Sequence, residues 1–190
     1  MERSKLIIIE GPQGVGKSGL TSYLREKVPS CDLYRLSGVK DKTITGREKS
    51  IQRYYSLMAY LKEQESVGLN ELFDRTFPTD YVYANLGYKE YDFEDIFKEL
   101  TEKLNNLNFD IYYFSLYLED PELFKIRLQR DDKHSYQEVS IDNSLKQQEE
   151  YKKVADYFKT FNNIKVYEIA TDDFDKAYRQ IDKILGIEKE

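Results

Sequence analysis

One glycine-rich segment near the start of the chain carries the clearest chemical pattern. Residues 11–18, Gly-Pro-Gln-Gly-Val-Gly-Lys-Ser, match G-x-x-x-x-G-K-[ST] in full. Small residues at this spacing let successive backbone N–H groups converge on phosphate oxygens, and a helix that begins here adds its positive end. In such a loop the lysine reaches the β- and γ-phosphates of a nucleotide, and the serine hydroxyl ligates Mg²⁺. The alternative is a glycine-rich turn without a ligand.

The flanking residues favour the nucleotide-binding interpretation. Residues 5–10 are an apolar, β-branched run that predicts a strand buried on both faces. Residues 18–27 carry apolar side chains at helical spacing. The loop thus joins a strand to a helix, as the pattern requires. We expect ATP and Mg²⁺ to be the cofactors, held by Gly11, Pro12, Gln13, Gly14, Val15, Gly16, Lys17, Ser18 and Gly19.

Short strand patterns alternate with helix patterns along the rest of the chain. We expect further strands at 32–36, 71–74, 109–118 and 164–169, and further helices at 47–65, 79–85, 93–104, 122–130, 144–161 and 174–185. Residues 40–46 predict a loop, and 131–140 lack apolar periodicity and predict a mobile segment. This alternation predicts an α/β domain spanning residues 1–190, with a mainly parallel sheet covered by helices.

Composition limits the classes of partner. The chain has 190 residues and a net charge of −6, which argues against an extended nucleic-acid surface. It contains no apolar run of 18 residues, so we expect no membrane span, and the apolar run at 6–9 is too short for a signal-peptide core. The single cysteine, Cys31, cannot form an internal disulfide, which favours a cytoplasmic location.

Further short motifs distinguish among proteins with this loop. The Asn-Lys-x-Asp motif of nucleotide-switch GTPases is absent. Instead, Glu10 precedes the loop, Asp74-Arg75 follows the third strand pattern, and residues 118–121 read Leu-Glu-Asp-Pro. Arg127, Arg130 and Tyr151 come later in the chain. With these motifs the sequence resembles the thymidylate kinase and deoxynucleoside kinase group of P-loop kinases, and residues 74–91 are most similar to thymidylate-kinase-like proteins of phages.

The resemblance implies a fold and an acceptor site. The fold would be a three-layer P-loop kinase domain with five parallel strands in the order 2-3-1-4-5 and a mobile lid at about 127–140. Glu10 would lie near substrate and metal, Asp74 would hold Mg²⁺ in a catalytic role, and Arg35 and Arg75 would hold the acceptor phosphate. The stretch around Arg35 keeps the family's Arg and Gly but lacks its Glu and Pro. The alternative for Asp74-Arg75 is a surface ion pair.

The resemblance assigns roles to two further groups of residues, and each group also has a purely structural interpretation. Arg53, Tyr54 and Tyr55 lie on the helix where the family stacks the acceptor base, although these tyrosines could equally face the core. For Tyr81, Tyr83 and Tyr88 the core is the favoured interpretation. Arg127 and Arg130 share one helix face, and the resemblance makes them catalytic lid cations, because the phosphate loop offers no arginine. Their alternative is a solvated basic helix end.

The favoured function is a nucleoside monophosphate kinase that moves the ATP γ-phosphate to a deoxynucleoside monophosphate, with dTMP as the leading acceptor. A deoxynucleoside kinase acting on a 5′-hydroxyl is the alternative, but it benefits from a carboxylate after the second strand, where Arg35-Leu36-Ser37 stands. A non-catalytic nucleotide-binding regulator is the third possibility. The partners would be small nucleotides rather than long nucleic acids or membranes, and the resemblance allows a homodimer.

Overall fold

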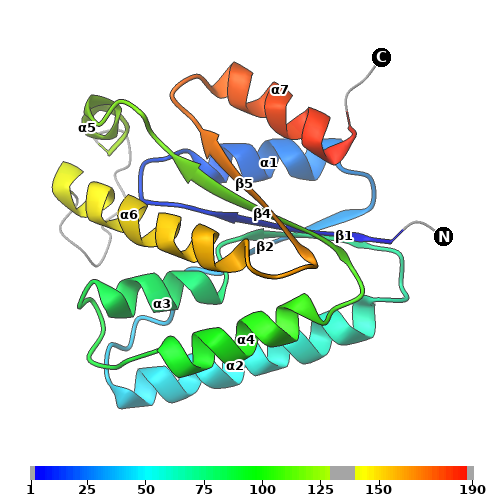
Figure 1. Ribbon diagram of the computed structural model, residues 1–190, viewed down its shortest axis with the longest axis horizontal. Helices are drawn as coiled ribbons and strands as arrows, with labels where there is room; N and C mark the ends of the chain where they lie inside the picture. The colour runs from blue at the N-terminus through cyan, green and yellow to red at the C-terminus, as the bar shows by residue number, and fades with distance from the viewer. Residues whose placement is uncertain (1–2, 129–139, 188–190) are drawn as a thin grey trace.

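The computed structural model describes residues 3–128 and 140–187, which form a layered α/β fold (Figure 1). Five parallel strands form one sheet in the order β2-β3-β1-β4-β5, so the predicted sheet and strand order are confirmed. The strands are β1 (Lys5–Glu10), β2 (Cys31–Arg35), β3 (Asn70–Asp74), β4 (Asp110–Tyr117) and β5 (Ile164–Ala170). The helices are α1 (Lys17–Lys27), α2 (Ile44–Gln64), α3 (Phe77–Asn85), α4 (Glu94–Asn105), α5 (Glu122–Leu128), α6 (Ile141–Phe158) and α7 (Phe174–Leu185).

Helices cover both faces of the sheet. Helices α2, α3, α4 and α6 pack on one face, and α1, α5 and α7 pack on the other (Figure 1). Successive strand residues point to opposite faces, so Leu6 and Ile8 join the first core whereas Ile7 and Ile9 join the second. The predicted three-layer fold is therefore confirmed.

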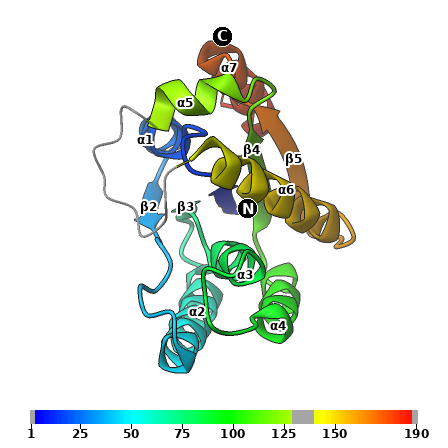
Figure 2. The same ribbon diagram turned by 90° about the vertical axis from the view of Figure 1, so that its left-hand side faces the viewer.

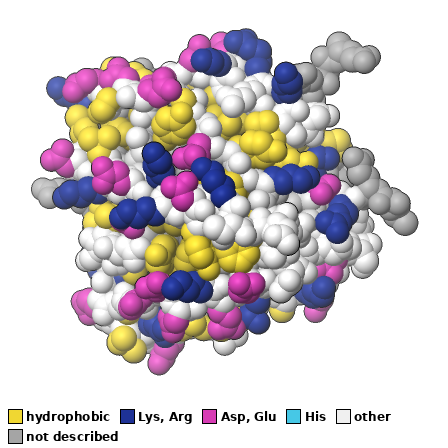
Figure 3. Space-filling model, in the orientation of Figure 1, with side chains coloured by type: hydrophobic (Ala, Val, Ile, Leu, Met, Phe, Trp, Pro, Cys, Tyr) yellow, Lys and Arg dark blue, Asp and Glu magenta, His cyan; other side chains and the backbone are white. Residues whose placement is uncertain are grey.

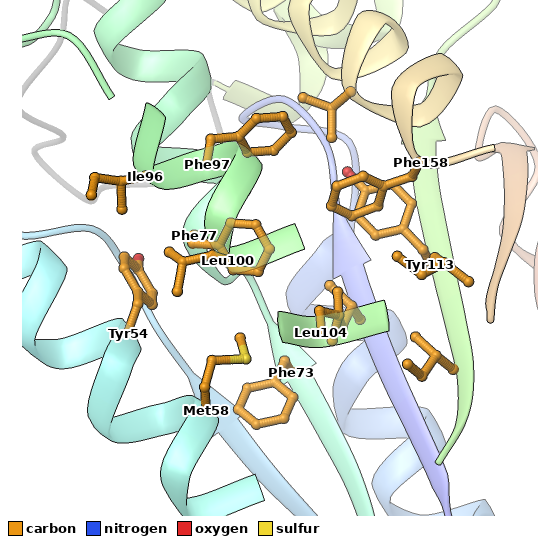
Figure 4. Close-up of a cluster of buried hydrophobic side chains, with 14 of the residues drawn as sticks. Tyr54, Met58, Phe73, Phe77, Ile96, Phe97, Leu100, Leu104, Tyr113 and Phe158 are labelled. Carbon is orange, nitrogen blue, oxygen red and sulfur yellow. The ribbon is translucent and has the colours of Figure 1, made fainter. Parts of the chain in front are cut away.

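The first core is rich in aromatic side chains (Figure 4). Phe97 of α4 stacks on Phe158 of α6 with ring centroids 5.8 Å apart, and Phe77 of α3 lies 5.9 Å from Phe97. Fully burying one such ring stabilises the fold by roughly 1.5–3 kcal/mol. This packing fixes α3 and α6 beside each other, and both helices contribute to the site described below.

Three helices begin two or three residues earlier than the sequence predicts, and α6 also ends earlier, at Phe158. Helix α2 begins at Ile44, inside the predicted loop, because Gly46 lets its first turn lie against the Asp41 carbonyl, where a Cβ would come within 1.9 Å. Helix α3 begins at Phe77, since Pro78 suits a first helical turn. Helix α6 begins at Ile141, because the Ser140 side chain accepts a hydrogen bond from Asn143 N at 3.1 Å.

The carboxyl ends of the strands meet at one edge, which faces the viewer in Figure 2. There Arg75 N donates to Ile9 O at 3.1 Å, and Leu36 N donates to Asp74 O at 3.0 Å. Ligands of open parallel sheets bind at this edge. Most of the predicted lid, residues 129–139, lies outside the described residues.

On the face shown in Figure 3, lysine and arginine side chains are interspersed with aspartate and glutamate. None of the helices within residues 3–128 and 140–187 is long and apolar enough to cross a membrane.

Candidate active site

The phosphate loop joins β1 to α1 and depends on glycine at two close approaches. Gly11 has φ of +148°, and a Cβ there would lie 2.7 Å from Leu116 O. Gly16 has φ of +101°, and a Cβ there would lie 2.4 Å from the ring of Phe174. L-residues with side chains rarely adopt such backbone conformations, so these glycines are required by the shape of the loop.

The side chain of Lys17 holds this shape from within. Its Nζ donates to Gly11 O at 2.9 Å and to Pro12 O at 2.7 Å, and the residue is 7% exposed. The loop is also braced from outside, because Thr171 Oγ1 donates to Val15 O at 2.7 Å. A cation thus lies at the centre of the loop, in the position that the motif predicts for binding phosphate.

Ser18 and Asp74 form a pair of oxygen donors beside the loop. Ser18 Oγ donates to Asp74 Oδ2 at 3.4 Å, and Asp74 is buried at the end of β3. A hydroxyl with one carboxylate suits Mg²⁺, which is commonly held by one or two carboxylates together with substrate phosphates and water. The described part of the chain has no cluster of three or more histidine, cysteine or acidic side chains that would form an all-protein metal cage. The donor set therefore fits a nucleotide-borne magnesium ion.

Arg75 follows Asp74 in the sequence, and its backbone has a positive φ. It has φ of +71°, a left-handed conformation that costs a residue with a side chain roughly 1–2 kcal/mol. Its Nη1 donates to Tyr83 OH at 2.7 Å, and no described carboxylate lies within ion-pair distance of its guanidinium. Burial opposes its charge, but the hydroxyls of Tyr83 and Tyr151 and nearby carboxylates outweigh it and raise the pKa of Arg75. Arg75 therefore stays charged at the edge of the sheet.

A cavity of about 160 Å³ opens beside Arg75 and the phosphate loop. Its lining contains four cationic side chains and no carboxylate among the described residues. The lining residues are Gln13, Ser37, Gly38, Val39, Lys40, Lys42, Arg75, Tyr83, Tyr88 and Lys89. Because cations and tyrosine rings surround the cavity, it suits a small anionic molecule with an aromatic part.

A buried carboxylate lies behind this cavity. Asp80 is fully buried, accepts a hydrogen bond from Tyr54 OH at 2.6 Å, and lies 3.9 Å from Lys89 Nζ. Lys89 Nζ also donates to Val39 O. Burial raises the pKa of Asp80 and lowers the pKa of Lys89. These contacts hold the segment after β2 over the cavity.

Glu10 is enclosed beneath the same edge. Its Oε1 accepts from Thr76 N at 2.6 Å, and its Oε2 accepts from Thr79 Oγ1 at 2.7 Å. Burial raises the pKa of Glu10 to about 7, although these hydrogen bonds and the charges of Arg75 and Lys17 oppose the rise. Glu10 therefore links β1 to the start of α3, directly under Arg75.

Other predicted acceptor residues lie outside the cavity lining. Arg35 Nη2 donates to Ser22 Oγ at 2.9 Å, and its Nε lies 3.8 Å from Asp74 Oδ2. Tyr54 belongs to the first core, and Tyr55 OH bonds to Glu99 on α4 at 2.7 Å. Arg53 lies at the margin, because its Nη1 donates to Ser37 O at 3.2 Å. The structure thus brings together Arg75, Asp74 and the phosphate loop, but not the two tyrosines.

Arg127 lies on the far side of the loop. Its Nη2 donates to Thr171 O at 2.7 Å, its Nη1 donates to Val15 O at 3.3 Å, and its guanidinium lies 4.3 Å from the centre of the Phe174 ring. It connects α5 to the phosphate loop and to the turn after β5. Its catalytic role stays a prediction, and Arg130 lies outside the described residues.

Sequence reasoning did not identify the lysines of the cavity. Its assignment of Tyr83 and Tyr88 to the core is confirmed, since Tyr83 belongs to the first core and Tyr88 packs against it, but both side chains also line the cavity. Lys40 and Lys42 fall in a polar stretch with no periodicity, and Lys89 follows α3 in another connection. Only the tertiary fold brings these connections together over Arg75. The Tyr83–Arg75 contact had a local signal, since Tyr83 lies eight residues further on in the helix that follows Asp74-Arg75.

Comparisons with known proteins support this architecture. No protein-family model and no curated protein matches the sequence. The structure resembles deoxyadenosine kinase from M. mycoides with bound dCTP, with a TM-score of 0.59 and 14% identity over 95% of this chain and 98% of that chain. It also resembles thymidylate kinase from Candida albicans, with a TM-score of 0.58 and 16% identity over 97% of this chain and 92% of that one. For thymidylate kinase from Ehrlichia chaffeensis the TM-score is 0.55 and the identity 14%, over 96% and 99% of the two chains.

At these identities the likeness establishes the fold. The chain has the fold shared by thymidylate kinases and deoxyadenosine kinase, as the sequence resemblance predicted. The geometry of its own site carries the functional argument that follows.

Proposed function

We propose that the protein is a nucleoside monophosphate kinase that transfers the γ-phosphate of ATP to a deoxynucleoside monophosphate, with dTMP as the favoured acceptor. One observation carries the proposal: the cavity beside the phosphate loop contains Arg75 and three lysines but no described carboxylate. Such a lining stabilises an acceptor that already carries a phosphate. An acceptor 5′-hydroxyl would instead benefit from a carboxylate base in contact with it.

In this proposal the loop and Arg75 hold the two reacting phosphates at one edge. Loop amides and Lys17 bind the ATP phosphates, and Ser18 and Asp74 would hold Mg²⁺. When bound, that ion neutralises charge on the β- and γ-phosphates. Arg75 positions the acceptor phosphate, while its contact with Tyr83 fixes the guanidinium. The work is positioning and charge stabilisation, so no covalent intermediate with the protein is required.

A deoxynucleoside kinase is the second candidate, favoured by the similarity to deoxyadenosine kinase. Such an enzyme would need a general base near the acceptor hydroxyl. Glu10 is the first candidate, because its pKa is raised to about 7. Both Glu10 oxygens are, however, already bound by Thr76 and Thr79. This arrangement supports a structural role for Glu10 and so favours the monophosphate acceptor.

The deciding experiment measures ADP release from Mg-ATP with dTMP, thymidine, dAMP and deoxyadenosine as acceptors. We expect turnover with a monophosphate and none with the nucleosides. Turnover with a nucleoside alone would overturn the proposal and make Glu10 the first candidate base. ATP binding without transfer to any nucleotide would instead support the non-catalytic regulator. A homodimer and a cytoplasmic location stay predictions of the sequence, and sedimentation of the purified protein tests the former.

A further inference from the structure

Helix α6 binds the backbone of one phosphate-loop residue on both sides. Gln13 N donates to Gln147 Oε1 at 3.0 Å, and Ser144 Oγ donates to Gln13 O at 3.2 Å. Ser144 and Gln147 are three residues apart and therefore share one face of the helix. Both are buried, at 1% and 0% exposure, so water does not compete for these bonds.

Gln13 lies where the two halves of the proposed site meet. It belongs to the phosphate loop, and it also lines the cavity that contains Arg75. The two preceding carbonyls are held by Lys17 Nζ, whereas both polar backbone groups of Gln13 are held by α6. Gln147 and Ser144 therefore fix the direction of the peptide between the donor and acceptor sites.

Gln147 satisfies the Gln13 amide while leaving a donor of its own unpaired. Its Nε2 is buried and has no hydrogen-bond partner among the described residues. A buried donor without an acceptor destabilises a fold by roughly 1–3 kcal/mol. An apolar side chain of similar length would remove this unpaired donor but would leave Gln13 N without its acceptor. Local rules are most often broken at functional sites.

We propose that Gln147, assisted by Ser144, is a positioning residue for phosphoryl transfer that acts through the backbone of Gln13. This inference rests on the proposed kinase function. Transfer requires the reacting groups to be held to a fraction of an ångström, and a misplacement of about 1 Å costs on the order of 100-fold in rate. Gln147 therefore affects turnover without contacting either substrate.

The test compares Gln147→Met with Gln148→Met. Gln148 is the adjacent residue of α6, and its side chain accepts from Leu118 N at 2.9 Å and donates to Leu118 O at 3.0 Å, away from the loop. Gln147→Met removes the acceptor for Gln13 N, so we expect kcat to fall roughly 10- to 100-fold with less than about a threefold change in either KM. Gln148→Met loses two hydrogen bonds and should lower the melting temperature at least as much, with kcat near that of the wild type.

Two further readouts make the outcome decisive. Gln147→Glu keeps an acceptor oxygen and, at pH 6 where burial holds the acid neutral, should restore kcat to within about threefold of the wild type. Hydrogen exchange of the Gln13 amide, followed by NMR without substrate, should speed up in Gln147→Met only. Equal kcat for the two methionine variants, or unchanged exchange at Gln13, would overturn the inference. Because exchange is read without turnover, an inactive wild type would refute the proposed function separately.

Discussion

Arg75 provides the sharpest test of the acceptor site, because stability and binding can be separated at this residue. Its φ of +71° suits glycine, and its Nη1 is already engaged by Tyr83 OH. The remaining guanidinium donors leave one to two charge-assisted hydrogen bonds for an acceptor phosphate, which contribute about 2–4 kcal/mol. Both Arg75→Ala and Arg75→Gly should therefore lower kcat/KM for the acceptor roughly 30- to 1,000-fold.

At most positions glycine makes a protein less stable than alanine does, but at position 75 we expect the reverse. Glycine removes the strain of the left-handed backbone, but it also raises the conformational entropy of the unfolded chain, which offsets part of the gain. Arg75→Gly should therefore be about 0.5–1 kcal/mol more stable than Arg75→Ala. For a chain of this size the melting temperatures should then differ by about 1–3 °C. Steady-state kinetics with dTMP, together with thermal unfolding, measures both effects.

Arg35→Ala is the matched comparison. The Arg35 side chain is 55% exposed and bonded to Ser22, outside the cavity lining, so we expect less than about a tenfold loss in kcat/KM for the acceptor. The reasoning would be refuted if Arg75→Ala and Arg75→Gly kept the acceptor kcat/KM of the wild type. An Arg35 effect larger than the Arg75 effect would move the acceptor phosphate toward α1.

Three other perturbations follow from the same structure. Lys17→Ala should reduce phosphoryl transfer by about 10²–10³-fold in a coupled ADP assay while circular dichroism shows an intact fold, and activity close to that of the wild type would remove this residue from the mechanism. Arg127→Ala should lower kcat about 10- to 100-fold and weaken ATP binding less; a change in ATP affinity alone would limit its role to bracing Val15. Burial, together with the charge of Asp32, raises the pKa of Glu71 to about 7. Between about pH 4.5 and 7 the folded state therefore binds more protons than the unfolded state, so the free energy of unfolding falls as pH rises through that range. Glu71→Gln should flatten this pH dependence and raise the free energy of unfolding by about 2 kcal/mol at pH 8, measured in urea, with unchanged activity at neutral pH. If the stability of the variant and of the wild type changed with pH in parallel, the assignment to Glu71 would be wrong.

The α/β class and the parallel sheet could be predicted because their signals are local and repeated, whereas the strand order followed from the family resemblance. Neighbouring residues alone are enough to predict the apolar run of β1, the glycine-lysine loop and the alternation of strands and helices. Helix starts were less accurate where a contact distant from the helix face decides them, as at Gly46 against Asp41.

The candidate site was predictable only in part, for the same physical reason. Asp74 ends β3 and Arg75 follows it, while Ser18 lies in the helix reached through the loop after β1, so a parallel sheet must gather them at one edge. Lys89 and Gln147 come from segments whose proximity depends on how α3 and α6 pack, and no spacing along the chain encodes it. Tyr54 shows the converse, since helical spacing could not decide between a substrate contact and the core position that it occupies.

The central claim is tested most directly by following the γ-phosphate itself. Incubating the protein with Mg-ATP labelled at the γ-phosphate and with dTMP, and then separating the products, shows where the label goes. The proposed function predicts label in a deoxynucleoside diphosphate, and loss of that product in Arg75→Ala. Label found only in inorganic phosphate, or label transferred to thymidine in a parallel incubation but not to dTMP, would contradict it.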